Sequence, residues 1–166
     1  MGLLRLGVLL LSVLPLFASK EIVVDLSEQR AYAYEDGSLV FDGRISSGVE
    51  GRETPAGEFH VLEKKKYHRS NMWPRPNGGA KMHYMLRLTY DGIAMHLGPV
   101  PNRPASHGCI RMKNGFAQKM FEWAEVGIPV VVEGDAQEFL FRKRAKKKKG
   151  TVTAYDDDYG VIDFHD

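Results

Sequence analysis

The chain has 166 residues, a formal net charge of +2 and 43% hydrophobic residues. This length fits one domain with appendages, and the hydrophobic content is sufficient to bury a core. Because acidic and basic residues nearly balance, no overall basic field predicts binding to nucleic acid, and we expect no such partner.

The first 19 residues, MGLLRLGVLLLSVLPLFAS, have the pattern of a secretory signal peptide. Arg5 supplies the early positive charge, an apolar run extends from Leu6 to Phe17, and the small residues Ala18 and Ser19 follow. A run of about 12 residues is too short to cross a hydrocarbon core about 30 Å thick as a helix. We therefore expect an exported, periplasmic or extracytoplasmic protein, with an uncleaved N-terminal anchor as the alternative.

Residues 20–134 have the pattern of a mainly β domain with one main α-helix. The Asp36-Gly37 pair is a strong hairpin signal between two apolar segments. The strands that we expect are Ile22–Leu26, Arg30–Tyr34, Leu39–Ile45, Phe59–Glu63, Tyr84–Thr89, Ile93–Leu97 and a last one ending near Glu133.

The segment NGFAQKMFEWAEVG predicts the helix, with Asn114 as its N-cap and Gly127 as its C-terminal stop. Its apolar residues recur at helical spacing, which predicts a face buried in the core. The Pro- and Gly-rich segment from Tyr67 to Met82 reads as a long surface loop, and loops of this length are often functional.

A charged tail follows from residue 135, and we expect it to be flexible. It has seven basic residues within Arg142–Lys149 and ends in the acidic segment YDDDYGVIDFHD. A block of like charge is usually solvated. The alternatives are a contact with an anionic envelope polymer or lipid head groups, and pairing of the basic half with the acidic half.

Cys109 is the only cysteine of the chain and lies in the segment ASHGCIRM. A lone cysteine forms no internal disulfide, so it is either a small buried hydrophobe or a reactive group. Free cysteine has a pKa of about 8.5, and a nearby imidazole would accept its proton and raise the thiolate fraction. His107 lies two residues before it, and His96 comes close if the loop LGPVPNRPAS folds back.

Gly108 gives the backbone freedom beside the thiol, and the amides of Gly108 and Cys109 are candidate donors to a developing oxyanion. A zinc site is the competing hypothesis, with His96, His107 and Cys109 as ligands. His60 or His83 would complete that site. No CxxC, HExxH or acidic cluster supports it, and we expect neither a metal nor an organic cofactor.

The segment MHYMLRLTYDGIAMHLGPVPNRPASHGCIRM, with TPAGEF before it and GIPVVV after it, resembles the L,D-transpeptidase (YkuD-type) catalytic domain family. The family motif is a histidine, a variable loop, Ser/Thr-His-Gly-Cys, a hydrophobic residue and Asn or Arg. The residues that fill it here are His96, Ser106, His107, Gly108, Cys109, Ile110 and Arg111. The resemblance extends from about Glu21 to Gly134; the loop between the histidines is shorter than in many members, and the tail lies outside the pattern.

The resemblance implies a β-sandwich-like fold and action on the stem peptides of bacterial peptidoglycan. The Cys109 thiolate would attack the carbonyl at the L-centre of diaminopimelate in a tetrapeptide stem and release D-Ala. The resulting thioester would pass the acyl group to an amine and form a 3→3 cross-link. A lysine of an envelope protein is another acceptor, water would make the protein an L,D-carboxypeptidase, and a non-catalytic wall-binding module is the last alternative.

The resemblance also assigns roles to single residues. Cys109 would be the nucleophile, and His96 the preferred base, with its second ring nitrogen oriented by a backbone carbonyl such as that of Leu97. His107 is the second choice for the base.

Four further residues are candidates for substrate binding. Arg111 would bind a substrate carboxylate, or else form a structural salt bridge. Ser106 and Gly108 would shape the loop or contact the substrate, and Tyr84 would line the cleft or pack in the core.

Overall fold

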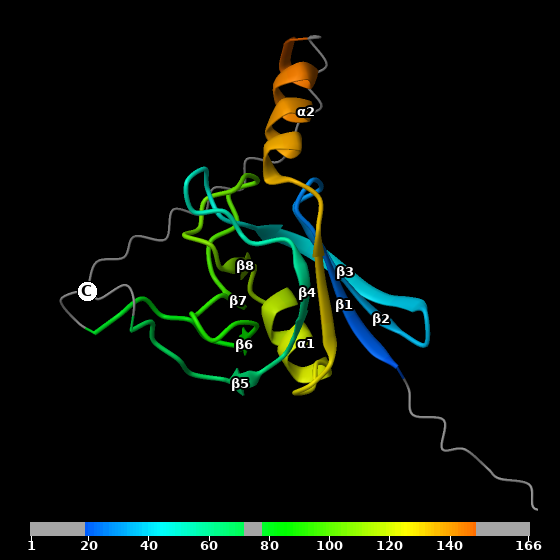
Figure 1. Cartoon of the computed structure of the whole chain (residues 1–166), viewed down its shortest axis with the longest axis vertical. Coiled ribbons are helices and arrows are strands. Elements are labelled where there is room, and N and C mark those ends of the chain that lie inside the picture. The colour runs from blue at the N-terminus through cyan, green and yellow to red at the C-terminus, as the bar shows by residue number, and fades with distance from the viewer. Residues whose placement is uncertain (1–18, 72–77, 149–166) are drawn as a thin grey trace, which may run out of the picture.

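The computed structural model describes residues 19–71 and 78–148 of the chain. Figure 1 shows the arrangement of nine strands and two helices within these residues. In chain order they are β1 (Lys20–Asp25), β2 (Arg30–Glu35), β3 (Ser38–Ser46), β4 (Gly57–His60), β5 (Glu63–Lys65), β6 (Met85–Arg87), β7 (Ala94–Leu97), β8 (Ile110–Met112), α1 (Phe116–Trp123), β9 (Pro129–Glu133) and α2 (Ala136–Lys148).

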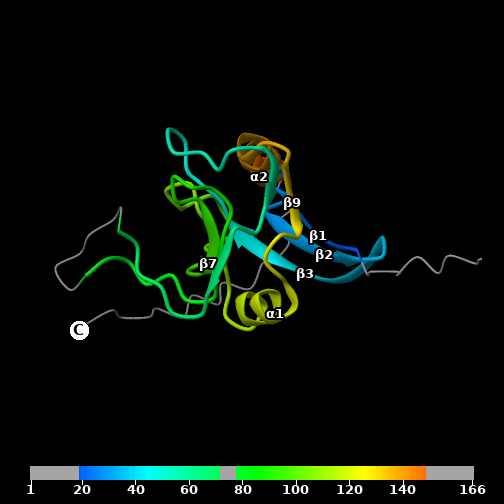
Figure 2. The same cartoon turned by 60° about the horizontal axis from the view of Figure 1, so that its bottom comes forward.

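The strands form one sheet in the order β4-β9-β1-β2-β3-β8-β7-β6-β5. The pairs β1–β9 and β7–β8 are parallel, and the other neighbouring strands are antiparallel. The sheet curls, and α1 lies between its two halves, as Figure 2 shows. The expectation of a mainly β fold with one main helix in the domain is confirmed.

The β2–β3 hairpin forms where the sequence predicts it. Asp36 and Gly37 both have positive φ, at 51° and 73°, which is the backbone that a two-residue hairpin turn requires. In β2 the side chains alternate, so that Ala31 and Ala33 are fully buried. The alternation therefore fixes which face of this hairpin covers the core.

Helix α1 fills the concave side of the sheet. Met120 is completely buried, and the ring of Phe41 on β3 meets the rings of Phe116 and Trp123 edge-to-face at 6.2 and 5.6 Å between centroids. A Cβ atom at Gly43 would lie 2.5 Å from Cγ of Phe116, so the absence of a side chain there allows the close approach. The prediction that the apolar face of this helix packs in the core is confirmed.

The predicted ends of this helix are wrong. Gly115, with φ 68°, is the N-cap in place of Asn114, and no side chain caps the helix. The helix stops at Ala124, and the amide of Gly127 instead donates to the carbonyl of Val61 at 2.8 Å. The contact of Gly127 with Val61, which lies between β4 and β5, takes this glycine away from the end of the helix.

Two strand predictions also differ from the structure. The expected strand Phe59–Glu63 is divided, because β4 pairs with β9 whereas β5 pairs with β6. Strand β8 was not predicted, and its three residues are too few to show an alternating pattern.

The first part of the charged tail, Ala136–Lys148, forms helix α2. Asp135 accepts a hydrogen bond from the amide of Gln137 at 2.8 Å, and Glu138 pairs with Arg142 one turn later. Capping, this ion pair and strong helix formers together explain helix α2. Figure 1 shows it projecting from the body, and Lys143 donates to the carbonyl of Asn102 at 3.1 Å.

The expected signal segment, the Pro-rich part of the long loop and the acidic end of the tail fall in residues 1–18, 72–77 and 149–166, outside the described residues. Pairing between the two halves of the tail is therefore not described either. Within residues 19–71 and 78–148, neither helix has the length and apolar character needed to cross a bilayer.

We predict that Met120→Ala lowers the free energy of unfolding by about 2–5 kcal/mol, because it leaves a cavity beneath the sheet. Urea denaturation followed by circular dichroism would measure the change. The matched control is Gln118→Ala on the exposed side of α1, which we expect to cost less than about 0.5 kcal/mol. An equal decrease in the free energy of unfolding in the two variants would contradict the assignment of this face of α1 to the core.

Candidate active site

The parallel pairing of β7 with β8 places three candidate residues on one face of the sheet. His96 is directly paired with Arg111, and Cys109 lies two residues before Arg111. Paired residues on neighbouring strands point to the same face, so His96 and Arg111 share a face. Cys109 directly precedes β8 and packs against Ala94, which lies two residues before His96 on β7 and so points to that same face.

Electrostatics show that the Arg111 guanidinium is close to all three titratable candidates. Burial lowers the pKa of His96 and of His107, and the charge of Arg111 lowers both further; burial raises the pKa of Cys109, and the charge of Arg111 opposes that rise. The structure thus brings together the four residues of the sequence motif that have titratable or charged side chains.

His96 is buried, with 8% of its surface exposed, and its Nδ1 lies 2.8 Å from the carbonyl oxygen of Leu97. A carbonyl only accepts, so Nδ1 must carry the hydrogen and Nε2 keeps its lone pair. The expected orientation by Leu97 is confirmed. Burial lowers the pKa of His96 to about 4, and the charge of Arg111 adds to the effect.

Cys109 is half-buried, and its Sγ lies 3.6 Å from the carbonyl oxygen of Gly92. The side chain packs against Met82, Met85 and Ala94. Burial raises the pKa of the Cys109 thiol, and a hydrogen bond from the backbone of Ala94 opposes this only in part. With the histidine pKa lowered and the thiol pKa raised, the resting pair at pH 7 is neutral rather than an ion pair.

The backbone before the thiol is held in one unusual conformation. Gly108 has φ 107°, and a Cβ atom there would lie 2.8 Å from Cδ1 of Ile93. Ser106 is 1% exposed; its hydroxyl donates to the carbonyl of Cys109 and accepts from the amide of Gly108 at 3.2 Å. These contacts favour the loop-shaping interpretation of Ser106 over direct contact with substrate.

Thr54 holds the same loop from the other side. Its Oγ1 accepts from the amide of Gly48 at 2.9 Å and donates to the carbonyl of Gly108 at 2.8 Å. Thr54 belongs to the TPAGEF segment, which the sequence analysis used only for the resemblance. Its contact with the cysteine loop bridges 54 residues of sequence, so local patterns gave no signal for it.

His107 and Arg111 lie at the surface side of the site. His107 is exposed, and its pKa is lowered by partial burial and by the charges of Arg52 and Arg111. Arg111 is half-buried, and the stem of its side chain lies over Gly98, which leaves room for it. Neither residue is sealed in the core, so both stay candidates for contact with substrate.

Tyr84 packs in the core, which is the second of the two roles considered for it. Its ring packs against the core and meets the ring of Phe121 on α1 at 5.8 Å between centroids. Its neighbour Met85, in contrast, packs on the side of Cys109. Lining of the cleft by Tyr84 therefore has no support from its position.

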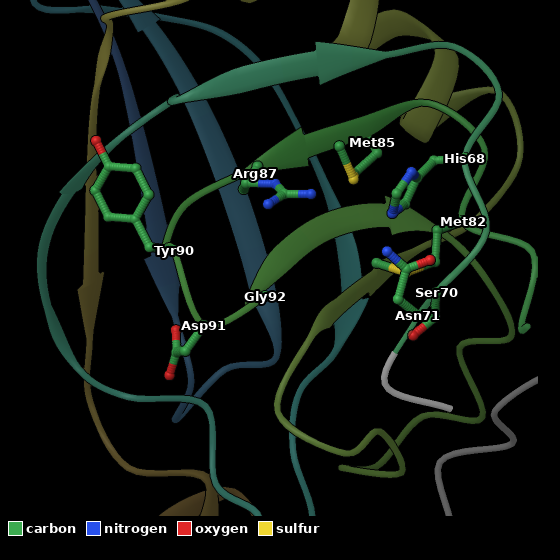
Figure 3. Close-up of a pocket in the computed structure, with 9 residues that line it drawn as sticks. All are labelled: His68, Ser70, Asn71, Met82, Met85, Arg87, Tyr90, Asp91 and Gly92. Atoms are coloured by element: carbon green, nitrogen blue, oxygen red, sulfur yellow. The ribbon is translucent and has the colours of Figure 1, made fainter. Parts of the chain in front are cut away.

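Figure 3 shows a pocket of the domain, which has a volume of about 180 Å³. It shares Met82, Met85 and Gly92 with the surroundings of Cys109. The full lining is His68, Ser70, Asn71, Met82, Met85, Arg87, Tyr90, Asp91 and Gly92. The long loop that the sequence marked as functional supplies part of this wall.

Four charged or titratable residues of the pocket, His68, Arg87, Tyr90 and Asp91, were not predicted from the sequence. Arg87 on β6 pairs with Glu63 on β5 at 3.1 Å. Burial lowers the pKa of His68, and the charges of Lys65 and Arg87 lower it further. Neither residue belongs to a motif; the pocket that they line shares Met82, Met85 and Gly92 with the surroundings of Cys109.

The zinc alternative finds no support in the geometry. Within the described ranges, no group of three or more histidine, cysteine or acidic side chains is arranged to hold a metal ion. His60 lies on β4 and is paired with Pro129, in the other half of the sheet from His96 and Cys109. The cationic Arg111 beside the thiol would also oppose a metal ion there.

Comparison with solved structures gives several L,D-transpeptidases. An enzyme solved in complex with imipenem is 25% identical, with a TM-score of 0.64 over 70% of this chain and 59% of the other. An enzyme from Mycobacterium smegmatis is 25% identical, with a TM-score of 0.63 over 70% and 59%. A mutant enzyme from Enterococcus faecium is 27% identical, with a TM-score of 0.61 over 72% and 51%.

The chain thus spans only between a half and three-fifths of the length of these structures. The comparison with curated proteins found no significant match. The model of the L,D-transpeptidase catalytic domain matches residues 19–132, which include every strand from β1 to β8 and helix α1. The chain therefore belongs to the L,D-transpeptidase catalytic domain family.

Proposed function

We propose that the protein is an exported peptidoglycan L,D-transpeptidase with Cys109 as its nucleophile. The observation that carries the proposal is the pairing of β7 with β8, which sets a buried, oriented imidazole beside a half-buried thiol. Membership of the family supports an acyltransferase acting on stem peptides of the cell wall. In this proposal residues 1–19 are the signal peptide, residues 20–134 the catalytic domain and residues 135–166 an appended tail.

In the first half-reaction, Sγ of Cys109 attacks the carbonyl carbon at the L-centre of diaminopimelate. Nε2 of His96 takes the thiol proton, and the carbonyl electrons move onto oxygen. The bond to D-Ala then breaks, its amine takes the proton back from His96, and a thioester remains. Because Leu97 holds Nδ1, the lone pair on Nε2 has a fixed direction.

In the second half-reaction, an amine of a neighbouring stem attacks the thioester. His96 takes a proton from this amine and returns it to the departing sulfur, so the enzyme ends as it began. The product is a 3→3 cross-link. Water in place of the amine would give a carboxypeptidase, and a lysine of an envelope protein would give a protein linked to the wall.

The neutral resting pair suits general-base catalysis rather than a preformed thiolate. Burial raises the pKa of Cys109 and lowers that of His96, so the proton moves only when the substrate carbonyl is in place. Arg111, whose charge favours the thiolate, is proposed to bind a carboxylate of the stem as well.

We also propose an electrostatic contact between helix α2 and anionic polymer of the envelope. Arg142, Lys143 and Arg144 are exposed on a helix that projects from the domain. Several cations on one short helix attract a polyanion, and salt would weaken the attraction.

Cys109→Ala should abolish formation of cross-linked dimers from purified disaccharide-tetrapeptides, because no other cysteine is available. Mass spectrometry of the products separates cross-linking, trimming and inactivity in one assay. Binding of the tetrapeptide, measured by calorimetry, should persist in the variant. Dimers formed by Cys109→Ala would show that the nucleophile has been assigned wrongly.

A carbapenem should acylate Cys109, since its strained carbonyl reacts with an accessible thiol. One of the similar structures was solved with imipenem. Intact-mass analysis should show one adduct on the reduced wild type and none on Cys109→Ala. If the folded wild type gains no mass, the proposal of a reactive thiol fails.

The rate of this acylation should fall at low pH with a midpoint near the histidine pKa of about 4. Below that pH the imidazole is protonated and accepts no proton; above it the rate should stay level toward neutrality. Rates measured between pH 3.5 and 7 would test this. The control is His107→Gln, which should keep the same profile, whereas His96→Gln should lose most activity at every pH. A midpoint at the ordinary histidine value of about 6.5 would contradict the role of buried His96.

A further inference from the structure

We infer that Thr54 is a positioning residue that sets the direction of the Cys109 amide toward the developing oxyanion. The inference rests on the proposed function. It goes beyond that function by naming a residue outside the catalytic motif on which acylation depends.

The argument begins with the peptide unit between Gly108 and Cys109. The carbonyl of Gly108 and the amide N–H of Cys109 belong to one planar group, and in the trans form they point in opposite directions. No cis peptide bond occurs in the described part of the chain. Whatever holds the carbonyl therefore also aims the N–H.

Thr54 holds that carbonyl. Its hydroxyl donates to the carbonyl oxygen of Gly108 at 2.8 Å, and Oγ1 of Thr54 itself accepts from the amide of Gly48 at 2.9 Å. Because a hydroxyl has only one hydrogen, the bond from Gly48 leaves that hydrogen for Gly108. Thr54 is 4% exposed, so water offers little competition for these bonds.

The backbone around Thr54 lies very close to Gly48. A Cβ atom at Gly48 would lie 2.0 Å from the carbonyl oxygen of Arg52 and 2.7 Å from the amide nitrogen of Thr54. On the other side, a Cβ atom at Gly108 would be in ordinary contact with the carbonyl oxygen of Glu53, at 3.6 Å. The segment 52–54 therefore lies between Gly48 and the glycine that precedes Cys109.

Of the two amides that could serve an oxyanion, only one depends on Thr54 in this way. The amide of Gly108 already donates to Oγ of Ser106 at 3.2 Å. The amide of Cys109 shares a planar peptide unit with the carbonyl of Gly108. Because Thr54 holds that carbonyl, it also fixes the direction of the Cys109 N–H. During acylation the new bond joins Sγ to the carbonyl carbon, the proton passes to His96, and the carbonyl oxygen gains the electron pair that this amide stabilises.

The test compares two reactions of the same thiol. Acylation by imipenem develops an oxyanion, whereas alkylation by iodoacetamide displaces iodide at carbon and develops none. Thr54→Val keeps the shape of the side chain without the hydroxyl, and Thr54→Ser keeps the hydroxyl. We expect Thr54→Val to slow acylation about ten- to hundredfold, less than the loss of an oxyanion donor itself. Alkylation should change by less than about twofold, since it follows the thiolate fraction.

Thr54→Ser should restore acylation. If Thr54→Val does not fold, Thr54→Ala and Thr54→Ser provide the comparison, because they differ by the hydroxyl alone. Acylation at the wild-type rate without the hydroxyl, or an equal loss in both reactions, would overturn the inference. Failure of the proposed function would look different, because the wild type itself would then not be acylated.

Discussion

The parallel pairing of β7 with β8 is the constraint on which the rest of the site depends. Parallel neighbours need a long connection, and here Gly98–Cys109 supplies it and returns the chain beside the strand that it left. This return brings Cys109 against Ala94, two residues before His96 on β7. The connection is itself fixed to β3 and the segment after it, because the amides of Ala105 and Ser106 donate to the carbonyl of Ser47 at 2.9 and 3.0 Å.

A buried polar network extends this anchoring into the core. Gln29 is 3% exposed, accepts from the amide of Ser47 at 3.0 Å and donates to its hydroxyl at 2.7 Å. Thr54 ties the same region to Gly108. Buried polar groups that have their partners specify one arrangement, since any other leaves them unsatisfied. Hydrogen bonds with Ser47 and Thr54 thus hold the loop before Cys109 in place.

Local signals in the sequence predicted local structure well. The Asp36-Gly37 turn and the apolar face of α1 depend on neighbouring residues alone, and both were predicted correctly. The division of Phe59–Glu63 into two strands and the three-residue strand β8 depend on distant partners. The motif identified the residues that meet at the site, whereas Arg87 and Thr54 reach it only through pairings and hydrogen bonds that no spacing reveals.

The burial of Cys109 affects how readily its sulfur is oxidised. Peroxides and disulfides react with thiolates far faster than with thiols, and oxidation beyond the sulfenic acid is essentially irreversible. A lone sulfur in an oxidising compartment, where we propose that this protein works, has no partner cysteine to rescue it. Because burial raises the pKa of Cys109 and so favours the thiol over the thiolate, the same burial should slow oxidation of this sulfur.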